Sequence, residues 1–371
     1  MSKINTRSPY YINFSEAGLE SVSLELYVYT GTQGTRGAVK YTLTSTAISE
    51  KVSFEISELV RDYIEIDFDG SYSNGAVWVD YQTTRTVSSV VQSSDSFVQL
   101  SASDGYGYFA EGSNPQNDSV IMQSNTLIQT DDYSNINIPI QVTEDTVVAY
   151  AKQGELLFQK TLLFSSLSSD QLQYVSNSAL DSDVFYNRVI ADGGTIESFQ
   201  CVQSVANGIY ESFDADRIYI NKGGVVSVVD VKEVEECKYQ TYKLTFVNKF
   251  GALQDLWFFK RSTLAMSTTQ ETYKSNIVTD GTYSINNHQR KILNKQGNET
   301  LTLNSGFYDE QYNEVFKQLF LSEQVWINYD TNTLPINITS NALTFKDKLN
   351  DKLISYEINV GFSNDVINNI R

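Results

Sequence analysis

The sequence offers few residues that could carry out acid–base or nucleophilic chemistry. Its only histidine, His288, lies in the polar stretch SINNHQRK, which supplies no evident partner to orient the ring as a general base. Lys222-Gly223-Gly224 lacks the spacing of a phosphate-binding loop and fits a β-hairpin turn better. A glycosidase would need two carboxylates, and no pair stands out among the 45 acidic residues. We therefore expect a structural role for His288 and no enzymatic activity.

Closely spaced carboxylates suggest cation binding, but none completes a known site. The pairs Asp181 with Asp183 and Asp214 with Asp216 could place two oxygens on one calcium ion. Neither pair is followed by the glycine and distal glutamate of an EF-hand loop, and the adjacent Asp131-Asp132 is no closer to one. Solvated turns are the favoured interpretation, with calcium as the alternative, so we expect no metal and no cofactor.

The two cysteines, Cys201 and Cys237, lie in segments that look like strands. Their spacing neither requires nor excludes a disulfide. Since the first 14 residues lack the apolar core of a secretory signal, we expect synthesis in the cytoplasm and favour two buried thiols.

Composition favours β-sheets and disfavours charged polymers as partners. The chain has 371 residues, enough for two or three domains, and is rich in aromatic side chains, with 24 Tyr and 19 Phe. Its net charge of -18 repels phosphate backbones and anionic lipid. No apolar run approaches the roughly 18 residues of a membrane span. We expect no nucleic acid and no membrane partner.

The first half of the chain has the alternating pattern of half-buried strands. In residues 21–30 the side chains of Val22, Leu24, Leu26 and Val28 share one face. Glycines at 31, 34 and 37 predict a loop, and residues 57–63 allow a short helical turn. Further strands are predicted at 41–44, 52–56, 64–68 and 76–83. We predict an immunoglobulin-like or fibronectin III-like β-sandwich over residues 1–168.

The polar segment 93–134 interrupts this pattern, and we interpret it as a long loop excursion. Strands predicted at 136–143, 146–152 and 155–164 then complete the first sandwich, and the serine-rich run 165–169 ends it.

Residues 169–371 are predicted to form a second β-rich part that contains one amphipathic helix. Gly223-Gly224 predicts a hairpin turn between two strands, and the apolar run in 253–261 predicts a strand covered on both faces. Apolar residues at helical spacing indicate a helix near 307–323, with Asp309 and Glu310 in its first turn. The other strands are predicted at 195–206, 217–220, 225–231, 239–248, 325–328, 334–338 and 354–362.

Two groups of aromatic residues are candidates for an interface. Tyr106, Tyr108 and Phe109 lie in the excursion, where they could stack on sugar rings or on a neighbouring protein. Packing onto their own domain explains them equally well. Trp257, Phe258 and Phe259 could likewise be covered by their own domain or by another subunit.

Several segments have a distinctive amino-acid sequence. They are RSPYYINF at 7–14, SVSLELYVYTG at 21–31, FEISELVRDYIEIDFDG at 54–70, LTFVNKFGALQDLWFFKRS at 244–262, ETYKSN at 271–276, SEQVWI at 322–327 and YEINVGFSNDVIN at 356–368. Together with Trp78 they cover about half of the chain. In these segments the chain resembles tail or baseplate structural proteins of phages that infect Bacteroidetes hosts.

The resemblance implies a virion protein, a hub, ring or adapter of the tail, that forms homo-oligomers and binds other tail or baseplate proteins. It carries over no active site, because none of these segments contains a catalytic motif. Heterologous contacts between two different faces of each subunit are what a ring requires. The alternative is a carbohydrate-binding adhesin that recognises host surface glycans through Tyr106 and Tyr108 during host attachment. A depolymerising glycosidase is a third possibility.

Overall fold

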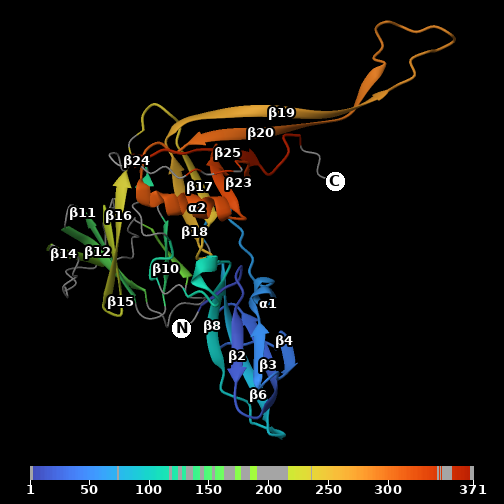
Figure 1. The fold of residues 1–371 in the computed structure, drawn as a ribbon. Helices are drawn as coiled ribbons and strands as arrows, with labels where there is room; N and C mark the ends of the chain where they lie inside the picture. Colours follow the sequence, from blue (N-terminus) through green and yellow to red (C-terminus); the bar gives the residue numbers. More distant parts are fainter. Residues whose placement is uncertain are drawn as a thin grey trace. The chain divides into compact units, whose positions relative to one another are not determined.

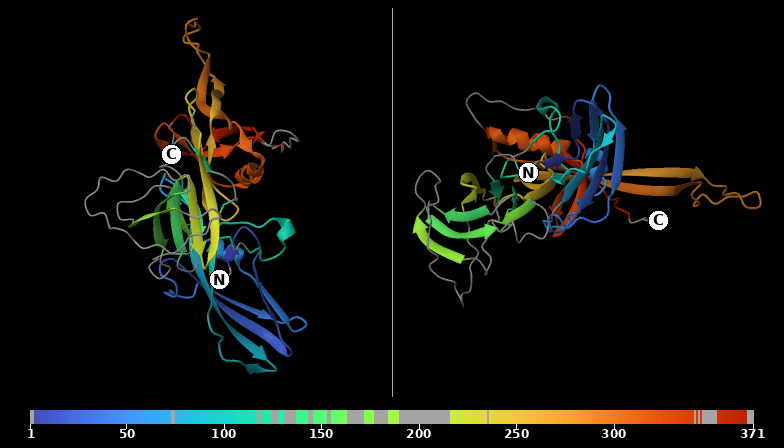
Figure 2. Two further views of the ribbon diagram at one scale, coloured as in Figure 1. Left: turned by 90° about the vertical axis from the view of Figure 1, so that its left-hand side faces the viewer. Right: turned by 90° about the horizontal axis from the view of Figure 1, so that it is seen from below.

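The computed structural model (Figures 1 and 2) describes residues 3–72, 75–116, 119–123, 128–130, 137–142, 146–152, 155–162, 172–176, 184–189, 216–234, 236–340, 342, 344 and 353–367. The fold is mainly β. The chain divides into two compact units that are not consecutive in sequence. Unit 1 comprises Met1–Glu235, Thr245–Leu256 and Gln311–Glu323, and unit 2 comprises Glu236–Leu244, Trp257–Glu310 and Gln324–Arg371. The expected boundary at 168/169 therefore falls inside unit 1.

The N-terminal part of unit 1 contains a six-stranded sheet with the order β1-β8-β6-β3-β4, in which β7 also pairs with β6. The strand β1 runs parallel to β8, and the other pairs are antiparallel. The strands are β1 (Lys3–Asn5), β3 (Leu19–Tyr29), β4 (Tyr41–Thr46), β6 (Ala76–Val87), β7 (Val90–Val91) and β8 (Val98–Ser103).

A second layer packs against this sheet through a shared apolar core. It consists of β2 (Tyr11–Ser15), paired with β5 (Lys51–Glu55), and the short helix α1 (Ser57–Arg61). The alternation predicted for residues 21–30 places Val22, Leu24 and Leu26 in the core, where none of the three is exposed. This core also includes Ile4, Ile12, Val52, Phe54, Ile56, Val60, Val77, Val79, Leu100 and Ala102.

Two predictions for this part were wrong. The segment with Ile64, Ile66 and Phe68 follows α1 without forming a strand. The supposed excursion 93–134 contains β8, which lies between β1 and β6 inside the sheet. The alternating Val98, Leu100 and Ala102 were the signal for β8, but the surrounding serines and aspartates obscured it.

The glycine-containing loop after β3 is held against the sheet by polar contacts. Arg36 forms an ion pair with Asp80, which is fully buried on β6, and the Arg36 guanidinium lies 3.9 Å from the ring centre of Phe97. The Tyr29 hydroxyl donates to Asp80 at 3.0 Å, and the indole of Trp78 donates to the Gly31 carbonyl at 2.9 Å. Burial, with a smaller contribution from Asp80, raises the pKa of Tyr29 to about 12.

The remainder of unit 1 contains a second six-stranded sheet with the order β14-β12-β11-β15-β16-β9, and a separate antiparallel pair β10–β13. Lys222 pairs with Val225, so Gly223 and Gly224 form the predicted two-residue turn, both with positive φ. The strands are β9 (Ile128–Thr130), β10 (Asn137–Gln141), β11 (Thr146–Lys152), β12 (Glu155–Leu162), β13 (Leu172–Ser176), β14 (Val184–Val189), β15 (Arg217–Lys222) and β16 (Val225–Glu233). The strand expected at 195–206 lies outside the described residues.

Unit 2 is built on a seven-stranded sheet with the order β18-β17-β22-β23-β25-β20-β19. The residues of β17 and β18 are divided between the two units. A short pair, β21–β24, accompanies the sheet. The strands are β17 (Tyr242–Val247), β18 (Leu253–Phe258), β19 (Lys260–Lys274), β20 (Arg290–Asn304), β21 (Tyr308–Asp309), β22 (Val325–Tyr329), β23 (Asn332–Ile338), β24 (Leu353–Ile354) and β25 (Glu357–Phe362).

The helix α2 (Asn313–Leu321) is shorter than the predicted 307–323 and belongs to unit 1. A 3-10 turn at Glu310–Tyr312 precedes it, and Tyr308 and Asp309 form β21 instead of a first helical turn. Its buried residues are Val315, Phe316, Leu319 and the polar Gln318. No helix in the described part of the chain is long and apolar enough to cross a membrane.

The structure describes one of the two cysteines. Cys237 is a free, exposed thiol, which corrects the expectation that it is buried. Cys201 lies outside the described residues.

Candidate interface surfaces

The aromatic residues predicted for an interface near 257–259 are covered by the chain itself. Trp257, Phe258 and Phe259 are 7, 0 and 2% exposed. Within unit 2, the Tyr308 hydroxyl donates to the Trp257 carbonyl at 2.6 Å, and the rings of Phe259 and Tyr308 lie 6.0 Å apart. The prediction of cover on both faces is confirmed for this segment. Its three aromatic residues are therefore not free contact surface, because packing within the chain already buries them.

The three aromatic residues of the second group differ in exposure. Tyr106 is 8% exposed, Tyr108 is half-buried, and Phe109 is fully exposed. The rings of Tyr106 and Tyr108 meet edge to face with 5.8 Å between their centres. Phe109 is the most accessible of the three to an outside partner, since Tyr106 is buried and Tyr108 is half-buried.

Tyr108 lies at the centre of a polar cluster in unit 1. Its hydroxyl donates to Glu314 Oε1 at 2.5 Å, and the ammonium groups of Lys317 and Lys249 lie 3.7 and 4.5 Å from its ring centre. Such cation–π contacts add to the binding of a ring that is already partly buried. Burial and the hydrogen bond to Glu314 raise the pKa of Tyr108 far above its ordinary value, so it stays a neutral donor.

Glu111 extends this cluster. Its carboxylate forms an ion pair with Lys249 and accepts a hydrogen bond of 2.9 Å from the Tyr108 backbone amide. Partial burial acts to raise the pKa of Glu111, but the hydrogen bonds from Lys249 and the Tyr108 amide, together with the charges of Lys249 and Lys317, hold that pKa below its ordinary value. Glu111 is therefore a charged structural partner.

Two arginines connect the N-terminal part of unit 1 to the residues that follow α2. Arg7 and Arg61 both form ion pairs with Glu323, at 3.1 and 2.6 Å, and Arg61 also binds Asp104 at 3.0 Å. Arg7 additionally donates to the Leu321 carbonyl at 3.0 Å. Burial raises the pKa of Asp104, although both arginines act in the opposite direction. We call Arg7, Arg61, Asp104 and Glu323 the arginine tether.

These clusters connect segments of unit 1 that are far apart in the sequence. Each ionic side chain in them has an opposite charge within 4.0 Å. Among the residues that the structure describes, no three His, Cys, Asp or Glu side chains gather as metal ligands. Most of the predicted carboxylates lie outside those residues: Asp131, Asp132, Asp181, Asp183 and Asp214. Of the pair Asp214 and Asp216, the structure describes only Asp216.

The surface that sequence reasoning missed is the hairpin of β19 and β20. Figure 1 shows the two strands running out from the sheet of unit 2, and Figure 2 shows them in two further views. Only residues 300–304 of β20 pair with β25, so β19 and β20 beyond that point pair only with each other. We call residues 264–296 the arm.

The arm exposes large apolar side chains that ordinary strands would bury. Met266 is 57% exposed, Ile292 52% and Leu293 69%. Leu293 lies at a register shift between the pairs Glu271–Asn294 and Thr272–Ile292, and such bulges redirect a side chain. Leu264, Tyr273, Val278, Tyr283 and Ile285 are also exposed.

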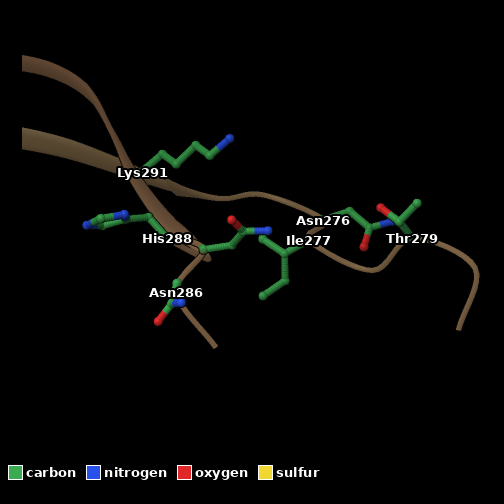
Figure 3. A pocket seen from close by; sticks show the side chains of 7 residues that line it. Asn276, Ile277, Thr279, Asn286, His288 and Lys291 are labelled. Atoms are coloured by element: carbon green, nitrogen blue, oxygen red, sulfur yellow. The ribbon is translucent and has the colours of Figure 1, made fainter. Parts of the chain in front are cut away.

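A polar hollow of about 390 Å³ lies at the end of the arm (Figure 3). Its lining comes from the residues between β19 and β20 and from the start of β20: Asn276, Ile277, Thr279, Asn286, Asn287, His288 and Lys291. The sequence predicted an exposed or hydrogen-bonded structural role for His288, and its side chain is exposed here. No charged partner within hydrogen-bonding distance orients its ring among the described residues.

Comparison with known proteins adds no family to this picture. No family model matches the chain, and no curated protein matches it significantly.

Proposed function

We propose that this protein is a structural component of a phage tail or baseplate, a hub, ring or adapter, which acts by self-assembly and not by catalysis. In this proposal it resides in the virion and binds further copies of itself and other tail proteins. The observation that carries the proposal is the arm, an exposed hairpin with uncovered apolar side chains. An isolated two-stranded hairpin is only marginally stable in water, so an arm of this length favours a protein that is completed by a neighbour.

Two further observations support the proposal. The segments that resemble Bacteroidetes phage tail proteins include ETYKSN, which covers the outer end of β19 in the arm. The charged and aromatic clusters of unit 1 join segments that are far apart in the sequence, which suits a building block. Within the proposal, the N-terminal sandwich is of immunoglobulin or fibronectin III kind, an architecture that many extracellular binding modules share.

The test is to purify the full chain and to measure its mass by sedimentation velocity over a concentration series up to micromolar. We expect a concentration-dependent oligomer. Mass spectrometry of purified particles of a phage that encodes the protein should then detect it at several copies per virion. A chain that stays monomeric and is absent from virions contradicts the proposal.

The alternative function, carbohydrate binding, now has a different candidate site. Tyr106 is buried, and the ring of the half-buried Tyr108 already contacts the ammonium groups of Lys249 and Lys317. The hollow at the end of the arm instead gathers three amides, a hydroxyl and an imidazole, groups that hydrogen-bond sugar hydroxyls. A glycan array on the full chain tests this alternative, and binding that disappears in Asn286→Ala/Asn287→Ala but persists in Phe109→Ala would support it.

A further inference from the structure

We infer that the arm docks on unit 1 of a second copy of this chain, with its cations facing a run of carboxylates there. This inference rests on the proposed function, since it names the partner and the surfaces of the self-assembly. Three independent features carry it: the open edge of the arm, its cations without an ion pair among the described residues, and the unequal distribution of charge between the units in the sequence.

The outer edge of the arm is open for pairing. β19 is the last strand of its sheet in the strand order, so no strand of the described residues covers its second edge. Residues 262–270 of β19, STLAMSTTQ, contain no charge and no proline. Natural edge strands normally carry charged residues or prolines, which prevent unwanted pairing. The absence of both over nine positions indicates an edge that another strand or surface covers.

The outer end of the arm carries cations that have no acidic partner. Lys274, Arg290, Lys291 and Lys295 are all exposed, and none forms an ion pair with any residue that the structure describes. Lys274 is placed directly opposite Arg290 in the register. Like charges at opposed positions destabilise a strand pair, so this arrangement favours an arm that meets an anionic surface.

The chain itself provides that surface. Unit 2 contains twelve Lys and Arg against eleven Asp and Glu, so unit 1 accounts for all of the net charge of -18. Attraction between the arm of one copy and unit 1 of the next speeds encounter and fixes the orientation of the contact. The same negative charge repels nucleic acid, which makes a second copy the better partner for these cations.

A specific complement to the arm lies in α1 and in the residues that follow it. Residues 58–69 carry five exposed carboxylates, and none of them is in an ion pair within the described residues: Glu58, Asp62, Glu65, Asp67 and Asp69. The one cation of this run, Arg61, is already held by Asp104 and Glu323. We call residues 58–69 the acidic strip, and we assign it as the docking site for the arm.

The contact is heterologous, because the arm and the acidic strip are different surfaces of each copy. Heterologous contacts form a ring if the rotation between copies closes, and a filament if it does not. Ile292 and Leu293 supply the apolar part of the contact, next to Lys291 in the sequence.

The test is a charge exchange in the full chain, measured by sedimentation velocity in buffer of low ionic strength. Lys274→Glu/Arg290→Glu/Lys291→Glu should weaken self-association at least about tenfold, as close charge pairs across interfaces do when they are broken. Asp62→Lys/Glu65→Lys/Asp67→Lys should weaken it similarly. A chain with all six substitutions should recover association, because the signs are opposite again.

The matched control reverses three exposed lysines elsewhere, Lys51→Glu/Lys232→Glu/Lys238→Glu, which changes the net charge by the same amount. We expect association within about twofold of the unaltered chain. Ile292→Ser/Leu293→Ser, which leaves the charge unchanged, should also weaken association. Circular dichroism verifies that each variant is folded.

The outcomes separate this inference from the proposed function. The docking assignment is wrong, while self-assembly stands, if the unaltered chain assembles and the arm variant assembles equally well. The same conclusion follows if the chain with all six substitutions does not recover association. If the unaltered chain is monomeric at every concentration, the docking assignment is wrong, and the proposed function is also wrong if virions lack the chain. Binding of a DNA duplex that depends on Lys274, Arg290 and Lys291 would assign the arm to nucleic acid and overturn the inference.

Discussion

Tyr108 holds segments together that are about 200 residues apart in the sequence. Its hydroxyl reaches Glu314 on α2, and the ammonium groups of Lys249 and Lys317 both lie within cation–π distance of its ring. The neutral phenol is essential, because a phenolate would face the Glu314 carboxylate. The raised pKa therefore reflects the same arrangement that makes the residue useful.

Tyr108→Phe isolates the hydroxyl from the ring. We expect a loss of about 1.5–3 kcal/mol in the free energy of unfolding, since a hydrogen bond to a charged group is removed while the cation–π contacts remain. Tyr108→Ala should cost more, because it also removes the ring. Urea denaturation provides the measurement. Phe109→Ala is the matched control: this neighbouring ring is fully exposed, and its removal should leave stability unchanged.

Asp95 gives a pH-dependent prediction. Thr83 donates to it at 2.6 Å and Arg85 at 2.9 Å, and these contacts hold its pKa below the ordinary 3.8 despite partial burial. A carboxylate whose pKa is lower in the folded state stabilises the fold above the unfolded value and loses that contribution as the pH falls through the folded value. Asp95→Asn should therefore destabilise the protein at pH 7.

The difference in melting temperature between Asp95→Asn and the unaltered chain should shrink as the pH falls below 3.8. Glu20→Gln, which removes an exposed carboxylate without a resolved ion pair among the described residues, is the control for the change in net charge. A difference that stays constant from pH 7 to acid would show that the Asp95 charge has no role.

At the scale of elements, the arginine tether is what attaches the end of α2 within unit 1. The helix has nine residues and no side-chain cap at its start, so its own backbone hydrogen bonds cannot keep it folded. Its order comes from its buried face and from the contacts of Arg7 and Arg61 with the residues at and just beyond its end.

Arg61→Ala tests this attachment. It leaves Asp104, which is largely buried, with a weaker counter-charge and removes one of the two cations on Glu323. We expect faster amide hydrogen exchange across Asn313–Leu321, while exchange in the β3–β6 strand pair is unchanged. Uniformly faster exchange in both regions would mean that Arg61 supports the whole unit and not the helix end.

Elements with one buried face were predictable, and elements exposed on both faces were not. Residues 21–30 alternate because one side of β3 faces the core. The glycine pair at 223–224 predicted a turn because glycine allows the positive φ values that both positions adopt. The arm lacks any alternation, since water surrounds both of its faces and no core selects one side. The run of adjacent apolar residues around Trp257 predicted a strand covered on both faces. Its covering partner Tyr308 was not predictable, because it is about 50 residues away in the sequence.

The ionic clusters were beyond sequence reasoning for a different reason. Arg7, Asp104 and Glu323 have ordinary neighbours in the chain, and only the fold brings them together. The division into units was equally hidden, because unit 1 draws on three separate segments. A boundary sought along the sequence could not have found it.

At the scale of the whole molecule, the separation of charge between the units dominates. Unit 1 carries the net charge, while unit 2 is close to neutral and holds the cations of the arm. Repulsion between copies acts through unit 1, so an attractive contact that includes unit 1 must neutralise part of it.

Salt should therefore weaken self-association. Raising sodium chloride from about 50 mM to about 0.5 M shortens the screening length several-fold and reduces the attraction between the arm and the acidic strip. We expect the dissociation constant from sedimentation to rise across this range. Stronger association at high salt would instead indicate an apolar contact limited by repulsion between unit 1 surfaces.

The segmented origin of unit 1 has a consequence for biosynthesis. The arm, residues 264–296, emerges from the ribosome before Gln311–Glu323, the last segment that unit 1 requires. Each nascent chain thus presents its arm while its own unit 1 is unfinished. Completed copies nearby already display a finished unit 1. The order of translation therefore favours the joining of a new chain to an existing assembly over the pairing of two unfinished chains.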